Sequence, residues 1–206
     1  MVVNEIIAIV IGYLLGSIPP AYIAARLVKG KDIRQIGGGN VGTLNTFKEV
    51  GRGAGVAVML ADMAKGAAAV AIARWLLDVP QPFVLAAGLA AIAGHNWSIF
   101  LKFTGGKGMA TALGALAILM LHYGYWQGLL IFLGIIATGL IITHNVALST
   151  GIALLCLPFI AWLGMKSGLF TIFAIILGLV IALKFLPTAK AAWAKSEGIK
   201  DFIRGH

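Results

Sequence analysis

Long apolar segments separated by short polar connections dominate the chain. Seven stretches approach the roughly 20 apolar residues that a membrane-spanning helix needs. They are Ile6–Ala25, Gly53–Leu77, Phe83–Leu101, Met109–Leu121, Gly128–Ile142, Ala147–Leu163 and Gly168–Leu186. The fourth and fifth are short and closely spaced, so the pattern allows five to seven spans. The sequence predicts an all-α fold, a polytopic membrane helical bundle of about seven transmembrane helices.

Composition agrees with this interpretation. Of the 206 residues, 60% are hydrophobic and only 11% are charged, whereas a soluble domain carries about a quarter charged residues. No polar stretch is long enough to fold separately, so we expect a single integral membrane domain, residues 1–206.

The basic residues are unevenly distributed between the connections. If the N-terminus lies outside, connections 26–52 and 102–108 and the tail from Lys184, with Lys200 and Arg204, face the cytoplasm and hold most of the 16 basic residues. This asymmetry follows the positive-inside rule and predicts a cytoplasmic C-terminus. It also accounts for the net charge of +9 without nucleic acid, because the aromatic residues lie in spans rather than among basic residues.

A glycine-rich loop lies in the connection after the first span. It joins three consecutive glycines to amide and basic side chains, and successive glycine N–H groups can form a concave anion site. The candidate phosphate-binding residues are Arg34, Gly37, Gly38, Gly39, Asn40, Gly42, Asn45 and Lys48. The alternative is a flexible turn near lipid head groups, because P-loop spacing is absent.

Two charged residues lie inside the second span. Asp62 and Lys65 are three residues apart, which places them on one helical face. Charges inside a membrane span are costly and usually functional. We expect them either to neutralise each other or to hold a polar ligand.

A third polar cluster follows the third span. It contains His95, which is either a base or an interfacial histidine, and a lysine set among glycines before a new helix: Gly105, Gly106, Lys107, Gly108 and Thr111. Helix N-termini attract anions, so Lys107 is a candidate phosphate clamp. No Cys/His spacing typical of a metal site occurs.

These clusters in this order resemble the bacterial acyl-phosphate:glycerol-3-phosphate acyltransferase family, PlsY. The resemblance covers residues 10–115 and rests on four segments. They are GSIPPAY at 16–22, Asp32–Arg34 with the glycine loop, DMAKG at 62–66 and GHNWSIFLKFTGGKGMAT at 94–111.

The resemblance implies a seven-helix bundle in the bacterial plasma (inner) membrane with its active site toward the cytoplasm. The implied reaction moves a fatty acyl group from acyl phosphate to the 1-hydroxyl of glycerol 3-phosphate, giving lysophosphatidic acid and phosphate without a cofactor. We expect His95 and Lys107 to be catalytic, and the other clustered residues, Asp62, Lys65 and Thr111 included, to bind substrate. Glycine amides at 105–108 would bind the oxyanion, and the base would be His95 or a substrate phosphate oxygen.

The sequence departs from the family pattern at several positions. Gly38 replaces a serine, Lys48 replaces an arginine, Ala147-Leu148 replaces a Ser-Leu pair, and the C-terminal pattern HRxNIxRLLxGxE is absent from residues 184–190. A paralogue with another acceptor, an inactive relative, and a transporter for a phosphorylated solute therefore remain alternatives.

Overall fold

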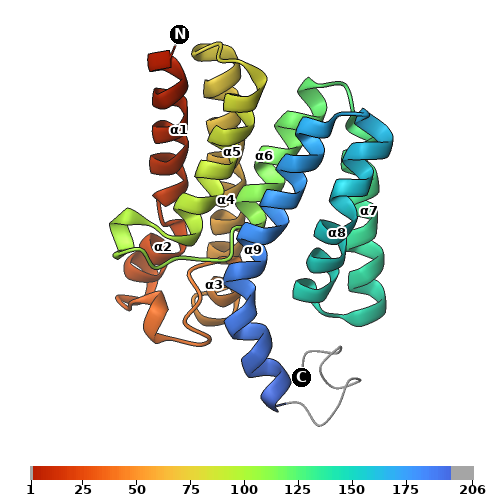
Figure 1. The fold of residues 1–206 in the computed structure, drawn as a ribbon. Helices are drawn as coiled ribbons and strands as arrows, with labels where there is room; N and C mark the ends of the chain where they lie inside the picture. The colour runs from red at the N-terminus through yellow and green to blue at the C-terminus, as the bar shows by residue number, and fades with distance from the viewer. Residues whose placement is uncertain (1, 196–206) are drawn as a thin grey trace. The chain divides into compact units, whose positions relative to one another are not determined.

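The computed structural model describes residues 2–195, which fold almost entirely into helices (Figure 1). In chain order these are α1 (Val2–Ser17), α2 (Pro20–Lys29), α3 (Thr43–Glu49), α4 (Arg52–Ala71), α5 (Gln81–Asn96), α6 (Met109–His122), α7 (Trp126–Thr143), α8 (Val146–Ile160) and α9 (Gly168–Lys195). Short 3₁₀ turns, η1 (Ile33–Gln35) and η3 (Ile99–Leu101), and π-helical ends, η2 (Ile72–Leu76) and η4 (Ala161–Met165), complete them. Lys200 and Arg204, counted above in the basic tail, lie outside the described residues.

Within residues 2–195, five helical segments are long and apolar enough to cross a membrane. They are Val2–Lys29, Arg52–Leu76, Trp126–Thr143, Val146–Met165 and Gly168–Ala191. Helix α6 is apolar but shorter. The all-helical, multi-pass architecture is confirmed, whereas the number of seven spans stays a prediction.

The predicted third span ends earlier than we expected. Phe83–Leu101 was one candidate, but α5 ends at Asn96 because Trp97 leaves helical geometry, with φ −132° and ψ 67°. The chain then folds back, and the Ser98 N–H donates to the Thr104 carbonyl at 3.1 Å. Hydropathy did not reveal this hairpin, because Ile99–Leu101 is as apolar as the helix before it.

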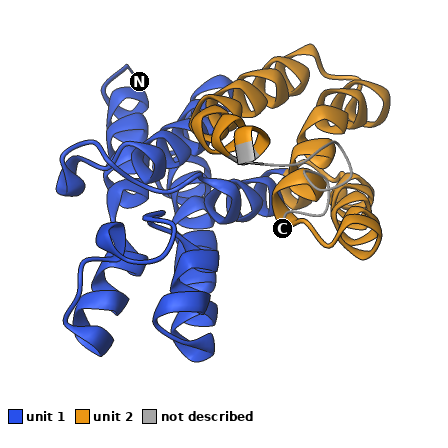
Figure 2. Ribbon diagram, turned by 90° about the horizontal axis from the view of Figure 1, so that it is seen from below, with its two compact units in different colours: residues 1–119 blue, residues 120–206 orange. Residues whose placement is uncertain are grey.

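The chain forms two compact units, residues 1–119 and 120–206 (Figure 2). In the first unit, α1 packs closely on α5 through small residues. A Cβ atom added at Gly12 or Gly16 would collide with the carbonyl oxygen of Ala87 or Ala91, respectively. This small-xxx-small pairing lets two helix backbones touch, as in many membrane helix pairs.

Helices α4 and α6 approach each other in the same way. A Cβ atom at Gly66 would collide with the Thr111 carbonyl, and one at Gly114 with the Met63 carbonyl. The face of α4 that carries the two intramembrane charges is therefore held next to the first turn of α6.

The second unit contains α7, α8 and α9. Helix α8 contacts both other helices, and Gly139 of α7 lies against Ser149 of α8. Aromatic rings of Tyr123 and Phe170 meet edge to face, with centroids 5.1 Å apart. All the predicted site residues lie in the first unit.

Candidate active site

The site begins where the first predicted span breaks. Pro19 and Pro20 lack the N–H groups that would continue α1, so it ends at Ser17 and α2 starts at Pro20. The released carbonyls find side-chain donors: the Ser98 hydroxyl donates to Ser17 O at 2.6 Å, and the Lys65 ammonium donates to Ile18 O at 2.9 Å. The Ser-Ile-Pro-Pro break thus ties α1 to α4 and to the hairpin after α5.

The two charges inside α4 form part of a buried triad. The Asp62 carboxylate is 1% exposed, and one of its oxygens lies 2.8 Å from Lys65 Nζ and 3.2 Å from His95 Nδ1. The two residues therefore form an ion pair, which was one of the two alternatives, and the contact of the same carboxylate with His95 was not predicted. Buried charges need a counter-charge and further hydrogen bonds, and the Asp62 carboxylate has both, in Lys65 and His95.

The other imidazole nitrogen faces the second glycine loop. A Cβ atom at Gly106 would collide with His95 Nε2 and would lie 2.5 Å from the Val41 carbonyl oxygen. The loops at 37–42 and 105–108 therefore meet at His95, although more than 60 residues separate them in the sequence. Only glycine fits at position 106. Because Gly106 has no side chain, the edge of the imidazole can approach both loops.

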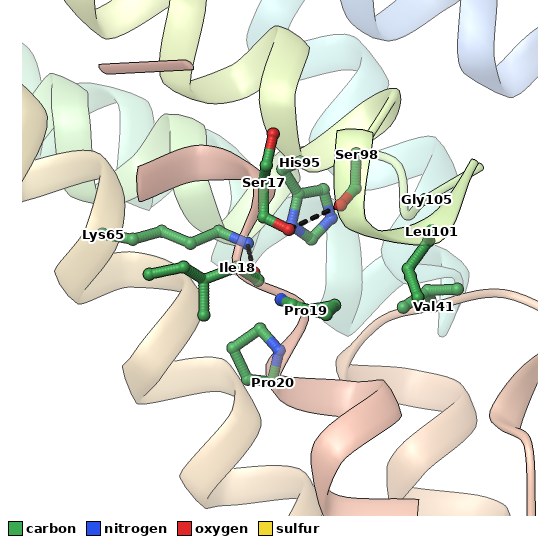
Figure 3. A pocket seen from close by; sticks show the side chains of 10 residues that line it. All are labelled: Ser17, Ile18, Pro19, Pro20, Val41, Lys65, His95, Ser98, Leu101 and Gly105. Atoms are coloured by element: carbon green, nitrogen blue, oxygen red, sulfur yellow. Dashed lines mark hydrogen bonds between the residues drawn. The ribbon is translucent and has the colours of Figure 1, made fainter. Parts of the chain in front are cut away.

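A small pocket opens at this meeting point (Figure 3). Its wall combines the Pro-Pro break, the α4 lysine, the imidazole and the two loops. The lining residues are Ser17, Ile18, Pro19, Pro20, Val41, Lys65, His95, Ser98, Leu101 and Gly105. The pocket therefore presents a cation, an imidazole and loop backbone to one small volume.

Several amides of the first glycine loop are used to shape it. The Gly38 N–H donates to the Asn45 side-chain oxygen at 3.0 Å, and the Gly39 N–H donates to Ile36 O at 3.1 Å. Gly37 and Gly39 have left-handed φ values of 56° and 67°, which glycine adopts without strain. The concave loop exists, but it keeps fewer donors for an anion than the sequence suggested.

Asn45 and Gly42 belong to this framework. The buried Asn45 amide donates to Ile33 O at 3.2 Å and to Ile36 O at 3.1 Å, while Gly42 N–H donates to Asn40 O at 3.1 Å. The Asn45 side chain is thus satisfied by the loop backbone.

Arg34 joins the first loop to the hairpin before the second. Its guanidinium contacts Asp32 at 2.6 Å and donates to Leu101 O at 3.4 Å and to the Thr104 hydroxyl at 3.3 Å. The hydrogen bonds from Arg34 lower the pKa of Asp32 to about 2. Asp32 was not among the predicted site residues, although the resemblance included it.

Lys107 is half-buried on the second loop, and this burial lowers the pKa of its ammonium group. Gly108 needs a left-handed φ of 75°, and Gly105 packs on the His95 carbonyl, which a Cβ atom would strike. The Gly106 N–H donates to that carbonyl at 3.1 Å. This N–H is therefore used within the loop. It is not aimed at an oxyanion, although we had expected it to bind one.

Three buried polar side chains have no hydrogen-bond partner among the described residues. They are Ser17 Oγ, both amide atoms of Asn96, and Thr111 Oγ1. Ser17 lines the pocket, and a Cβ at Gly108 would lie 2.7 Å from Asn96 Oδ1. Unsatisfied buried groups are rare and concentrate at functional sites. Thr111 was predicted; Ser17 and Asn96 were missed, although polar residues at two apolar helix ends were a usable signal.

The structure thus gathers some predicted residues and leaves others peripheral. His95, Asp62, Lys65, Gly105 and Gly106 meet directly. Lys48 is exposed, and Asn40 is half-buried beside Gly42. Within residues 2–195, no group of His, Cys, Asp and Glu side chains is placed to hold a metal ion.

Sequence comparison finds close relatives along almost the whole chain. A family model described as glycerol-3-phosphate acyltransferase matches residues 6–195. Glycerol-3-phosphate acyltransferase 1 of Dehalococcoides mccartyi is 51% identical over 179 residues, covering 87% of this chain and 86% of that protein. The Geotalea daltonii glycerol-3-phosphate acyltransferase is 39% identical over 197 residues, covering 95% of this chain and 97% of that protein.

Two crystal structures of PlsY (YgiH), an integral membrane glycerol 3-phosphate acyltransferase, have a similar fold. The glycerol 3-phosphate form matches with a TM-score of 0.80 and 28% identity over 92% of each chain. The lysophosphatidic acid form matches with a TM-score of 0.75 and 25% identity, covering 97% of this chain and 98% of that chain.

Proposed function

Because this chain belongs to the glycerol-3-phosphate acyltransferase family, we propose that its paired glycine loops and buried imidazole carry out acyl transfer to glycerol 3-phosphate. The resemblance drawn from the motifs is confirmed, and the protein is a membrane acyltransferase of phospholipid synthesis. The family also decides against the transporter alternative. The site residues and the individual steps below are our assignment.

The observation that carries the assignment is the orientation of His95. Its Nδ1 atom lies 3.2 Å from the Asp62 carboxylate, so that carboxylate favours the tautomer with a proton on Nδ1. The basic lone pair is then on Nε2, which faces Gly106 and the meeting point of the loops. A carboxylate that orients an imidazole in this way supports general-base catalysis.

The reaction needs one proton acceptor and a place for one leaving phosphate. The 1-hydroxyl oxygen of glycerol 3-phosphate attacks the carbonyl carbon of acyl phosphate, and its proton moves to His95 Nε2. The carbonyl oxygen then re-forms its double bond as the bond to the phosphate oxygen breaks. Inorganic phosphate leaves and takes the proton, and the new ester is lysophosphatidic acid. Acyl phosphate is already activated, so positioning suffices without a protein nucleophile.

We assign the phosphate groups to the two loops. Lys107 is the cation of the second loop, beside the first turn of α6, and binds one phosphate there. The first loop contributes Asn40, with Lys48 at its outer edge, for the other phosphate. We reassign Arg34 and Asn45 to a supporting role, because the loop framework already occupies them.

The oxyanion of the tetrahedral intermediate needs donors other than the Gly106 N–H. The Asn96 amide, at the end of α5 and against Gly108, and the Thr111 hydroxyl, in the first turn of α6, are buried and have no hydrogen-bond partner among the residues that the structure describes, so we assign this role to them. Removing one oxyanion donor typically costs about 100-fold in rate.

We further propose that α5 and α6 also cross the bilayer, which gives seven spans in one membrane domain, residues 1–206. The family model crosses both compact units, which supports a single domain. Charge places the N-terminus outside and the C-terminus in the cytoplasm of a bacterial plasma membrane. Cysteines introduced at Lys29 and Asp78 in a Cys156→Ser protein should react with an impermeant maleimide from opposite sides of sealed vesicles. Reaction from the same side would contradict this topology.

The reaction itself is tested by identifying products. Purified protein in nanodiscs, given acyl phosphate and a panel of polyol phosphates, should form lysophosphatidic acid from glycerol 3-phosphate, as measured by mass spectrometry. Lys107→Ala should raise the KM for a phosphorylated substrate and lower turnover, while Lys107→Arg should retain part of both. Undiminished turnover in Lys107→Ala would remove Lys107 from the site.

The same panel tests the acceptor, which the altered first loop and the missing C-terminal pattern left open. Release of free fatty acid and phosphate with every acceptor, or preference for another polyol phosphate, would contradict the assignment to glycerol 3-phosphate.

A further inference from the structure

The turn that leads into the second glycine loop has two faces. Leu101 is 5% exposed and packs with Ala21 and Ala25 of α2 in one buried cluster. On the other face, Phe100 and Phe103 are 60% and 61% exposed. The buried leucine anchors the turn, and more than half of each phenylalanine is exposed among the residues that the structure describes.

The backbone of this turn has an unusual conformation that hydrogen bonds support. Lys102 and Phe103 are consecutive non-glycine residues with left-handed φ values of 55° and 59°, a conformation that is rare for bulky side chains. Hydrogen bonds hold it: Phe103 N–H donates to Ser98 O at 2.8 Å, and Thr104 N–H donates to Leu101 O at 3.2 Å. The outward display of the aromatic rings is therefore built into the turn.

Helix α2 adjoins the turn and also exposes apolar and basic side chains. Figure 1 shows the yellow-green turn beside α2, and Leu101 joins the two elements. On α2, Leu27 and Val28 are 81% and 59% exposed, next to exposed Lys29. Lys102 is exposed at the tip of the turn and makes no ion pair with any residue the structure describes. The turn and the C-terminal end of α2 thus both expose apolar and basic side chains.

We propose that this surface, formed by Ile99–Phe103 and Leu27–Lys29, is a lipid-contact site that binds anionic phospholipid. Phe100 and Phe103 enter the upper acyl-chain region, while Lys102 and Lys29 contact phosphate headgroups. This combination of apolar and basic residues is typical of elements that lie at a bilayer interface. Only Thr104 separates the turn from Gly105, so the turn fixes how deep the catalytic loop sits. This inference goes beyond the proposed reaction and does not depend on which group acts as its base.

The apolar half of the proposal is tested by depth measurement. A fluorescent label on Phe100→Cys in a Cys156→Ser protein, in nanodiscs, should emit as in an apolar environment and be quenched by lipids brominated near the top of the chain. Lys31→Cys, in an exposed connection, is the matched control and should report water. A water-like label at position 100 would overturn the proposal.

The charged half is tested by lipid retention. Native mass spectrometry of the purified protein should show preference for phosphatidylglycerol over phosphatidylcholine, and Lys102→Gln should lower that preference about fivefold. Lys166→Gln makes the same charge change in the connection before α9 and should leave the preference unchanged. Equal preference in wild type and Lys102→Gln would overturn the proposal. Neither variant touches the proposed catalytic residues, so failure here leaves acyl transfer intact.

Discussion

At the scale of single residues, the site depends on one carboxylate with two partners. Asp62 neutralises the Lys65 ammonium and also holds the imidazole of His95 in place. Asp62→Asn should therefore lower kcat about 100-fold with little change in the KM for glycerol 3-phosphate, because the imidazole loses its orientation while the loops remain.

A companion variant separates orientation from charge balance. Asp62→Asn leaves Lys65 buried without its counter-charge, whereas Asp62→Asn/Lys65→Met removes both charges. Thermal unfolding in detergent should show that the double variant recovers stability, and product assays should show that it does not recover kcat. Recovery of kcat together with stability would mean that Asp62 has only a structural role.

Lys107 should give the activity a distinctive alkaline limit. Burial lowers its pKa from the usual 10.5, and only the charged ammonium attracts phosphate. Phosphate binding should therefore weaken as pH rises through that lowered pKa, before an ordinary lysine would lose its charge. We predict that kcat/KM for acyl phosphate, corrected for spontaneous hydrolysis, falls at lower pH in wild type than in Lys107→Arg. If kcat/KM falls over the same alkaline pH range in wild type and in Lys107→Arg, Lys107 is excluded as the titrating group.

Asp32 should control stability at acidic pH. Its pKa is about 2 in the folded protein against an ordinary value of 3.8, so its stabilisation is complete above about pH 4 and is lost as pH falls toward 2. Asp32→Asn should lower the unfolding temperature at neutral pH by several degrees, for a loss of about 2 kcal/mol. The difference from wild type should shrink at about pH 3.

A matched change tests whether this effect comes from burial. Asp78 forms an ion pair with Arg74, but the Asp78 side chain is 83% exposed, and exposed pairs contribute little. Asp78→Asn should thus leave the unfolding temperature nearly unchanged. An equal loss in both variants would contradict a special role for Asp32.

The sequence revealed more about residue types than about their pairing. Lys107 among glycines and a charged pair inside a span are visible in the sequence because such residues are unusual there. The contact between Asp62 and His95 is not visible, because it joins α4 to α5 through tertiary packing. Hydrogen bonds that occupy Arg34 and Asn45 are equally hidden, so both were predicted as ligands.

At the scale of elements, glycines set the distances between helices. Gly66 lets α4 touch α6 beside Asp62 and Lys65. Gly66→Ala would push a methyl group into the Thr111 carbonyl, and it should destabilise the protein by about 1–3 kcal/mol and reduce activity. Gly53→Ala is the control in the same helix, because a Cβ there meets no atom within 4 Å. Similar unfolding temperatures for the two variants would show that α4 and α6 are not in close contact.

Most helices could be predicted from hydropathy, whereas their interruptions could not. The segments predicted to start at Gly53, Met109, Gly128, Ala147 and Gly168 each begin within a few residues of a helix start, although α9 continues to Lys195, beyond the predicted end at Leu186. The α5 end was misplaced because the following hairpin is apolar. The turn Ile99–Phe103 is where we propose lipid contact. Contact with lipid would explain why this turn is apolar, and its apolar residues are what hid the end of α5 from the hydropathy pattern.

At the scale of the whole molecule, residues from distant parts of the chain meet in one site in the first unit. The Pro-Pro break frees carbonyls for Lys65 and Ser98, small residues bring the helices close, and two glycine loops meet at His95. The prediction that the loops would converge is consistent with the contact between Gly106 and Val41. The long-range order of these elements was available only from the family resemblance, since periodicity carries no information about which helices are neighbours.

The most direct measurement is the rate of lysophosphatidic acid formation by His95→Gln in nanodiscs, quantified by mass spectrometry beside wild type. We predict that kcat falls about 100-fold or more, that the KM for glycerol 3-phosphate changes only a few-fold, and that the unfolding temperature is preserved. Turnover within about threefold of wild type would be well short of a general-base effect and would contradict His95 as the base. A phosphate oxygen of a substrate would then be the remaining candidate for the proton acceptor.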